Sequence, residues 1–324
     1  MSDPVGGVRC GFDADGLFMI WIDVPGKPVN TLSAATWDGL DAAVGRIERE
    51  RPAGVIIASA KPRSFVAGAD LFELREMSDE ALDRHLACGQ SILDRLEAAG
   101  MPTVAAINGD TLGGGLELAL ACRFRVAADD PRSRLGLPET TLGLVPGWGG
   151  TFRLPRLIGL ERALALMVPG KTVPPAEAVA LGLVDRLTTR ERLIETAREL
   201  VSTTPALRAA AVAQDAASRD ELIARFRRST RERSGDHLPA PLRLLDVVAT
   251  GCTGTVAEAE AAERRGLIDM RATLAGRNLI RLFFLKTAAK KTAAAEAGET
   301  PRPVRSAVVL GGGTMGAGIA AALA

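Results

Sequence analysis

The sequence predicts an α/β core followed by a mostly helical part, and three observations support this fold class. Up to about Gly147, short apolar runs suited to buried strands alternate with longer segments of helical spacing. Beyond Gly147 almost all strand signals disappear, apart from the short stretch LVDRL. The 324 residues are 47% hydrophobic and 24% charged, which is the composition of a globular protein with a sizeable core.

Four segments before Gly147 have the β-branched and apolar composition of buried strands. They are residues 17–24, 54–60, 102–108 and 123–128. The stretch KPRSFVAGAD after the second strand is predicted to be a loop because Pro and Gly interrupt it.

Helices are expected between these strands. Ser33 is a suitable cap for a helix over about 34–50. Leucine and isoleucine recur at helical spacing over about 78–99, and a glycine turn at 113–115 leads into a further helix.

The later part of the chain is predicted to be helical over 189–231 and over one long helix at about 255–295. A loop is expected at 232–241, where Gly235, Pro239 and Pro241 fall close together. We therefore divide the chain into four regions. They are an α/β core (1–190), a helical region ending in a linker helix (191–296), a polar linker (297–305) and a short terminal segment (306–324).

Charge and cysteine content narrow the class of protein. Forty Lys and Arg against 39 Asp and Glu give a formal net charge of +1, and Tyr is absent, which argues against nucleic-acid binding. The four cysteines are far apart, as expected for reduced thiols in a cytoplasmic protein. The glycine-rich run 307–324 is a poor membrane span. No metal pattern accompanies His85 or His237, which are expected at the surface or at helix caps.

The stretch GDTLGGGLELALACRFRVAA (109–128) places Glu117 among Leu and Ala. A buried carboxylate is costly and usually has a partner or a task. Gly113, Gly114 and Gly115 precede it at the start of the expected helix, where free N–H groups favour a negative oxygen. A plain tight turn would explain the same glycines.

A second glycine loop, FVAGAD (65–70), also follows a buried strand, so one N–H from each loop could converge on an oxyanion. Glu139 lies 22 residues beyond Glu117, again among apolar residues and glycines. Two carboxylates in one pocket can divide acid and base work. Glutamates that cap helices or pair with Arg123 and Arg125 remain the alternative.

Four motifs together resemble the enoyl-CoA hydratase/isomerase (crotonase) superfamily. They are VNTL (29–32), SFVAGADL (64–71), AAINGDTLGGGLELALAC (105–122) and LGLPETTLGLVPGWGGTFRLPRLIG (135–159). The resemblance covers roughly residues 5–290. It implies a crotonase-like ββα spiral core, an acyl-CoA thioester as substrate, and no cofactor beyond the coenzyme A of that substrate.

The resemblance also implies roles. The backbone N–H groups of Ala69 and Gly114 would form the oxyanion hole for the thioester oxygen. Glu117 would activate water, and Glu139 would exchange the proton at the α-carbon. Gly147 would shape the water site.

Weaker expectations concern the coenzyme A path. The resemblance places Lys61, Ala67, Asp70 and Lys286 along it, with Lys290 and Lys291 on the same late helix. A solvated helix face explains these lysines equally well. Trp148 and Phe152 border the acyl pocket or belong to the core. Two departures from the family are Arg123, where an acidic residue is common, and a longer turn at 129–134.

The terminal segment VVLGGGTMGAG contains Gly311, Gly313 and Gly316 in the spacing of a dinucleotide-binding turn after a strand-like run. This order resembles the α-subunit of bifunctional fatty-acid oxidation complexes, in which a 3-hydroxyacyl-CoA dehydrogenase follows the hydratase. A complete unit needs about 30 residues, so we expect a truncated piece whose last strand is unpaired. NAD would bind only in a full-length parent.

The leading hypothesis is hydration of trans-2-enoyl-CoA in β-oxidation, with Δ3-Δ2 isomerisation as a side activity. The alternatives are a scaffold for the missing dehydrogenase domain or a thiolase subunit, and another acyl-CoA reaction of the superfamily. An oligomer, homomeric or heteromeric, is expected.

Overall fold

The computed structural model describes residues 2–203, 215–235, 237–296 and 306–323. These form two compact units, Met1–Ile280 and Arg281–Ala324. The expected linker at 297–305 lies outside the described residues. All the residues of the candidate catalytic centre belong to the first unit.

A six-stranded sheet forms the base of the first unit, in the order β1-β2-β3-β5-β7-β10. Its strands are β1 Val8–Phe12, β2 Phe18–Ile22, β3 Val55–Ser59, β5 Thr103–Ile107, β7 Phe124–Ala128 and β10 Arg186–Thr188. The β1–β2 pair is antiparallel and the other pairs are parallel. The four strands predicted from composition are confirmed as β2, β3, β5 and β7. Strand β1 was not predicted.

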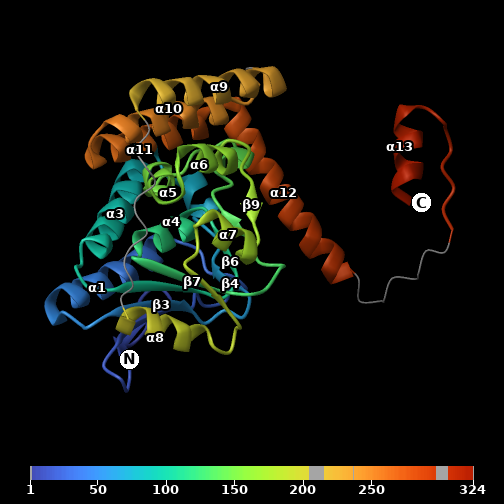
Figure 1. Ribbon diagram of the computed structural model, residues 1–324. Coiled ribbons are helices and arrows are strands. Elements are labelled where there is room, and N and C mark those ends of the chain that lie inside the picture. The colour runs from blue at the N-terminus through green and yellow to red at the C-terminus, as the bar shows by residue number, and fades with distance from the viewer. Residues whose placement is uncertain (1, 204–214, 236, 297–305, 324) are drawn as a thin grey trace. The chain divides into compact units, whose positions relative to one another are not determined.

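Both faces of this sheet are buried, which explains its uninterrupted apolar runs. On β3, Ile57 packs into the main core, whereas Ile56 packs into a second cluster with helix α8 Leu193–Thr203. Helices α1 Ala34–Glu50 and α3 Asp79–Glu97 contribute to the main core on the opposite face. Figure 1 shows α8 beneath the sheet. The Ser33 cap is confirmed, since its side chain accepts from the Thr36 amide.

A smaller sheet carries the loops of interest. It contains β4 Ser64–Val66, β6 Asp110–Leu112, β8 Leu135–Gly136 and β9 Thr172–Val173. Strands β4, β6 and β8 are mutually parallel, so their carboxyl ends meet at one edge of the sheet. The prediction of a loop throughout 61–70 is therefore wrong at residues 64–66. Strands of two or three residues are too short to show a period of two.

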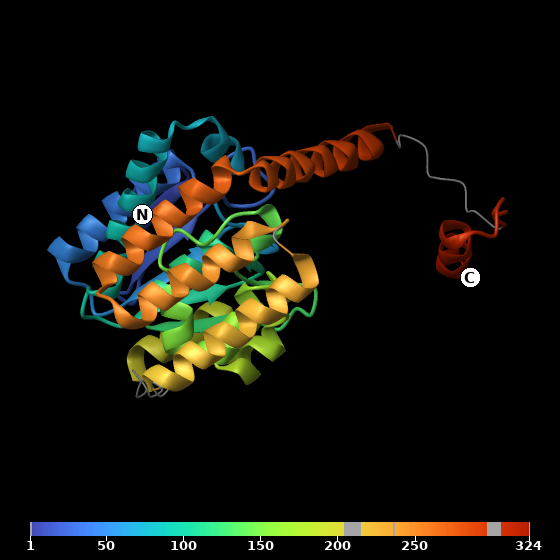
Figure 2. The same ribbon diagram turned by 90° about the horizontal axis from the view of Figure 1, so that it is seen from above.

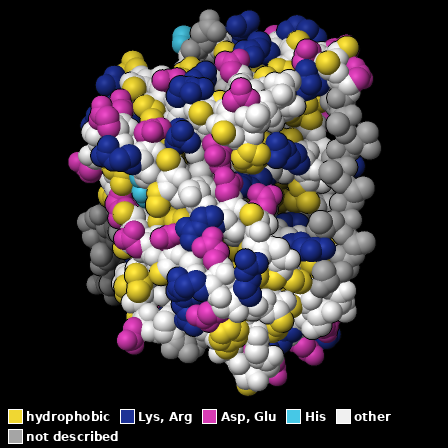
Figure 3. Space-filling view, turned by 90° about the vertical axis from the view of Figure 1, so that its left-hand side faces the viewer, with side chains coloured by type: hydrophobic (Ala, Val, Ile, Leu, Met, Phe, Trp, Pro, Cys, Tyr) yellow, Lys and Arg dark blue, Asp and Glu magenta, His cyan; other side chains and the backbone are white. Residues whose placement is uncertain are grey.

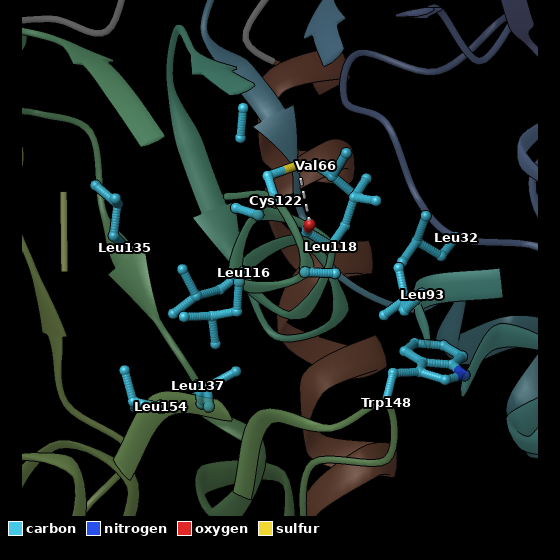
Figure 4. Packing of buried hydrophobic residues seen from close by; sticks show 14 of the residues in the cluster. Leu32, Val66, Leu93, Leu116, Leu118, Cys122, Leu135, Leu137, Trp148 and Leu154 are labelled. Atoms are coloured by element: carbon cyan, nitrogen blue, oxygen red, sulfur yellow. Dashed lines mark hydrogen bonds between the residues drawn. The ribbon is translucent and has the colours of Figure 1, made fainter. Parts of the chain in front are cut away.

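Helix α4 Gly114–Ala121 begins at that edge and is buried at every position. A helix that is apolar nearly all round belongs in a core. Figure 4 shows it surrounded by packed side chains, with Leu135 and Leu137 on one side and Leu32, Leu93 and Trp148 on the other.

The remaining helices of the first unit lie mostly beyond Gly147 and complete the fold around this core. The elements are α2 Leu71–Glu76, the 3₁₀ turn η1 Glu139–Leu142, α5 Gly150–Ile158, α6 Leu160–Met167, α7 Pro175–Leu181, α9 Ala216–Ser234, α10 Pro239–Thr253 and α11 Val256–Ala272. Helix α10 packs between α9 and α11 (Figure 2). On the face seen in Figure 3, basic and acidic side chains are interspersed.

The single long helix expected at 255–295 is in fact two helices, α11 and α12 Leu274–Glu296. The backbone of Thr273 is extended between them. Its hydroxyl accepts a hydrogen bond from the Gly276 amide at 3.0 Å, as an N-cap does. The hydroxyl thus offers the backbone a local alternative to the helical hydrogen bond, which helical spacing does not reveal.

In the second unit, residues 306–312 pair with no described strand, which agrees with the expectation of an unpaired one, and α13 Thr314–Leu323 follows with no buried residue. A Cβ placed on Gly316 would lie 1.8 Å from the carbonyl oxygen of Gly311, so glycine is required at this turn. No helix among the described residues is long and apolar enough to cross a membrane.

Candidate active site

The loop FVAGAD (65–70) contains Ala69, and its pairing with Leu32 sets the direction of the Ala69 N–H group. Leu32 bridges to Ala69 in parallel fashion: the Leu32 amide donates to Gly68 (2.9 Å), and the Asp70 amide donates to Leu32 (3.2 Å). In such a bridge the N–H of the middle residue points the other way. Within the part of the chain that the structure describes, the Ala69 N–H has no acceptor.

The second loop supplies a similar donor. Gly113 caps α4 with φ 53°, and the Gly114 N–H is the first of the helix, with no acceptor among the described residues. A Cβ placed on Gly68 would lie only 3.9 Å from the Gly114 nitrogen, so the two loops are in contact. The structure thus brings the segments of Ala69 and Gly114 together.

Glu139 lies beside the same loops, because η1 follows β8 at the shared sheet edge. A Cβ placed on Gly113 would be 2.8 Å from Glu139 Oε1. Glu139 Oε2 is buried without a hydrogen-bond partner among the described residues. Burial raises the pKa of this carboxyl above its usual value, so it holds a proton more readily than an exposed glutamate.

Glu117 is 1% exposed and is held by backbone amides, not by arginine. Its Oε1 accepts from the Trp148 amide at 2.7 Å and the Gly150 amide at 2.8 Å. Burial raises its pKa, and the negative charge of Glu139 adds to this effect. Arg125 instead pairs with Asp185. The alternative of a Glu117–Arg125 pair therefore does not describe this structure.

Oε2 of Glu117 receives no hydrogen bond from the described residues. Oε1 carries both anchoring bonds, so Oε2 is left for a water molecule or a substrate atom.

Gly147 and Trp148 pack against neighbouring helices and against the second glycine loop. A Cβ on Gly147 would be 2.9 Å from Leu86 and from Leu267, so this position allows the turn to approach α3 and α11. The Trp148 ring packs on Gly114, where an added Cβ would be 2.6 Å away. Its ring centroid lies 5.7 Å from that of His85. His85 is therefore buried, and the expectation of a surface position is wrong.

A third buried carboxylate, Glu263, was missed. It is 0% exposed and accepts from the Gly149 and Thr151 amides at 2.6 and 2.9 Å. Its neighbours in sequence, AEAAERRG, suggest a solvated helix face. The buried residues Ala259, Ala262, Gly266, Leu267 and Met270 of α11 follow the helical period, however, and place Glu263 on their face.

The structure describes most of the residues expected along the coenzyme A path. Lys61 pairs with Asp23 at 2.7 Å and donates to the Val24 carbonyl oxygen. The Ala67 amide donates to Asn30, and Asp70 caps α2 and pairs with Lys27. Lys286 is exposed in the second unit. The side chains of Lys290 and Lys291 lie outside the described residues.

A hollow of about 630 Å³ lies in the first unit, beside the Lys61–Asp23 and Lys27–Asp70 pairs. Arg9, Lys27, Asp23, Val24, Ser33 and Glu73 contribute to its lining. Among the described residues, no group of three or more His, Cys, Asp or Glu side chains is placed to hold a metal ion.

Comparison with known proteins gives the class of this fold. The profile of the enoyl-CoA hydratase/isomerase family matches residues 14–232. The chain belongs to this family, whose fold is that of the crotonase superfamily. Enzymes of the family need no cofactor beyond the coenzyme A of the substrate.

Three solved structures illustrate the likeness. An enoyl-CoA hydratase from Bacillus anthracis is 28% identical with a TM-score of 0.58, covering 88% of this chain and 96% of its own. Human mitochondrial delta3-delta2-enoyl-CoA isomerase is 26% identical with a TM-score of 0.65, covering 88% of this chain and 99% of its own. Pseudomonas aeruginosa DspI is 26% identical with a TM-score of 0.58, covering 73% and 92%.

Proposed function

We propose that this protein hydrates trans-2-enoyl-CoA thioesters to 3-hydroxyacyl-CoA in fatty-acid β-oxidation. One observation carries the proposal: two amides without acceptors, Ala69 N–H and Gly114 N–H, lie on adjoining loops beside Glu117 and Glu139. These donors suit a thioester oxygen that becomes negative as the enolate forms. A single donor of this kind contributes about 10²–10³ in kcat.

The two glutamates would divide the proton transfers. Oε2 of Glu117 takes a proton from water while the water oxygen bonds to the β-carbon. Glu139 starts protonated, which its burial favours, and gives that proton to the α-carbon, while Glu117 starts ionised, which the Trp148 and Gly150 amides favour. Glu117 then holds the proton taken from water, and exchange with solvent returns one to Glu139. The sum is addition of one water molecule across the double bond.

Arg9 and Lys27 lie at the hollow beside the Asp70 loop and would receive phosphates of the coenzyme A. The Lys61–Asp23 pair would stabilise the same rim. The assignment of Lys286 to the coenzyme A path stays a prediction. Gly147, Ala67 and Asp70 would shape the loops without contacting the reacting carbons.

A second activity, Δ3-Δ2 isomerisation, is favoured by the likeness to the human isomerase, which has a TM-score of 0.65. Glu139 alone would move a proton between the α- and γ-carbons of a bound dienolate. Glu117 would then be dispensable for isomerisation and required for hydration.

The motif Gly311, Gly313 and Gly316 supports a wider proposal, that the chain is the hydratase part of a bifunctional protein with 3-hydroxyacyl-CoA dehydrogenase. NAD would bind only where that whole domain is present. A thiolase subunit and further copies of the chain are the partners proposed, in the cytoplasm. A purely scaffolding role for this chain is the competing reading.

Loss of enoyl-CoA absorbance, followed across chain lengths from crotonyl-CoA upward, tests the proposal. We expect turnover by the wild type and none by the Glu117→Gln/Glu139→Gln double variant with assembly intact. Turnover by the double variant would overturn the assigned roles. An assembled but inactive wild type would favour the scaffold. NADH formation should not occur with this chain.

A further inference from the structure

Glu263 is a buried carboxylate that the proposed reaction does not use. It lies in the middle of α11, beyond residues 14–232 that the family profile matches. Both of its oxygens accept strong hydrogen bonds. Oε1 takes the Thr151 amide (2.9 Å) and the Thr151 hydroxyl (2.6 Å), and Oε2 takes the Gly149 amide (2.6 Å).

The contacts of Glu263 alternate with those of Glu117 along one turn. The turn consists of Trp148, Gly149, Gly150 and Thr151, and the N–H groups of its last three residues are among those left free where α5 begins. Trp148 and Gly150 donate to Glu117, whereas Gly149 and Thr151 donate to Glu263. The turn is thus held between two carboxylates from opposite sides.

We propose that Glu263 is a positioning residue of the active site: it fixes the 148–151 turn so that the Trp148 and Gly150 amides hold Oε1 of Glu117 in place. Glu263 itself touches no reacting atom. This proposal rests on the hydratase assignment for its kinetic meaning, but the geometry it invokes stands without that assignment.

Other groups around Glu263 support a fixed turn. Gln90 on α3 donates to the Gly147 carbonyl oxygen at 2.9 Å and points its amide at Glu263 as well. The buried Arg153 donates to the Trp148 carbonyl oxygen at 3.0 Å. Both carbonyl oxygens and amides of residues 147–151 are therefore held by side chains. Because the Trp148 and Gly150 amides in turn bind Oε1 of Glu117, a fixed turn also fixes the position of Glu117.

Several charges face Glu263 and bear on any pH effect. They are Glu117 from α4, Glu139 from η1, Arg153 from α5, and Glu260 of α11 itself together with Asp94 of α3. On α10, Arg243 approaches Gly266, one turn further along α11, and pairs with Asp269. Removing Glu263 changes both the turn and this set of charges, so two variants are needed.

The first variant is Glu263→Gln. Its amide nitrogen would face either the Gly149 or the Thr151 N–H, so one bond is lost and the turn moves. We expect kcat for crotonyl-CoA hydration to fall about 10–100-fold with little change in KM, the size expected when a reacting group is misplaced. Glu260→Gln, the same change one turn earlier on α11 without a bond to the turn, should leave kcat unchanged.

The second variant is Thr151→Val, which removes one hydroxyl and keeps the charge of Glu263. The amides of Trp148 and Gly150 lower the pKa of Glu117, so slackening the turn should raise it. We expect a several-fold lower kcat and an acidic limb of the pH–rate profile shifted to higher pH. Thr151→Val also decides the question if Glu263→Gln fails to fold.

A folded Glu263→Gln variant with the kcat of Glu260→Gln would overturn the proposal, as would Thr151→Val with unchanged kcat and pH profile. The pKa of Glu117 can also be measured without enzymatic activity, by following the infrared bands of the buried carboxyl groups as pH changes. The band that disappears in Glu117→Gln belongs to Glu117. If the wild type hydrates no enoyl-CoA but Thr151→Val still raises the pKa of Glu117, the hydratase assignment fails and the positioning role stands.

Discussion

The two sides of the 148–151 turn differ in what they leave unpaired. On the α11 side, both oxygens of Glu263 are occupied by hydrogen bonds from the turn. On the side of the two glycine loops, the Ala69 and Gly114 N–H groups and Oε2 of Glu139 have no partner within the described chain. Buried polar groups are normally satisfied. The unpaired amides and the unpaired carboxyl oxygen beside the two glycine loops therefore mark where a substrate would complete the hydrogen bonding.

The difference has an energetic side. A buried polar group without a partner costs about 1–3 kcal/mol, so the unpaired groups beside the two glycine loops lower the free energy of unfolding. Such trade-offs between stability and activity are common at functional sites. Variants of the residues around the two glycine loops probe this cost, and they are ordered here from the largest expected effect to the smallest.

The largest effect is expected for Glu117→Gln. Both anchoring bonds of Glu117 end on Oε1, which the glutamine carbonyl oxygen can replace, so the fold should be kept. Loss of a general base lowers kcat/KM about 10²–10⁴-fold. Steady-state hydration assays beside the exposed-site control Glu76→Gln would check this. A loss of less than tenfold would contradict the role of Glu117.

Gly113→Ala should have the next largest effect. Its φ of 53° strains any side chain, and the new Cβ would lie 2.8 Å from Glu139 Oε1 and displace that carboxyl. Gly100→Ala is the matched control, with φ 79° but nothing within 4 Å. Both should lose about 1–3 kcal/mol of stability from backbone strain. Only Gly113→Ala should lose activity, and equal activity of the pair would contradict the placement of Glu139.

Glu139→Gln should show the opposite signs for activity and stability. Burial raises the pKa of Glu139 in the folded state, so unfolding releases a proton once pH exceeds the ordinary glutamate pKa of about 4.3. Rising pH therefore destabilises the wild type, and glutamine removes this effect. We expect the variant to melt at a higher temperature than the wild type, and the difference in Tm to grow from pH 5 to pH 9. Each ~1 kcal/mol of added stability corresponds to about 2–4 °C in Tm. Parallel melting curves would refute the shifted pKa.

The smallest effect is expected from deletion of residues 306–324. Helix α13 buries no residue, and the candidate catalytic centre lies within Met1–Ile280. The free energy of unfolding should change by no more than about 0.5 kcal/mol. The kcat/KM for hydration should stay essentially the same. Thermal melts and kcat/KM of the shortened chain would check this. A large loss of either would mean that the second unit contributes to the site.

The sequence predicted those elements whose signal is local and periodic. Helix α1 carries a capping serine, and strand β3 has an apolar run buried on both faces, so both follow from composition. The four-stranded sheet could not be predicted from composition, because pairing between segments as short as Leu135–Gly136 is decided by tertiary contacts. The break at Thr273 depended on a side-chain hydrogen bond that helical spacing does not show.

The same contrast holds for the candidate site. Glu117 and Glu139 stood out because each interrupts apolar sequence, and motif resemblance supplied the loops of Ala69 and Gly114. Glu263 did not stand out because it lies in a run of Ala, Glu and Arg that resembles an exposed helix. Only the burial of Ala259 and Leu267 on the same helix face distinguishes it.

The bridge between Leu32 and Ala69 has a consequence for how this protein would be studied. The direction of the Ala69 N–H is set by backbone register, so exchanging the side chain at position 69 leaves the donor in place. A conventional alanine scan would pass over it. Slipping the 68–70 segment by one residue against Leu32 would turn the donor around, so an insertion or deletion in that loop should be more damaging than exchanging the side chain of residue 69.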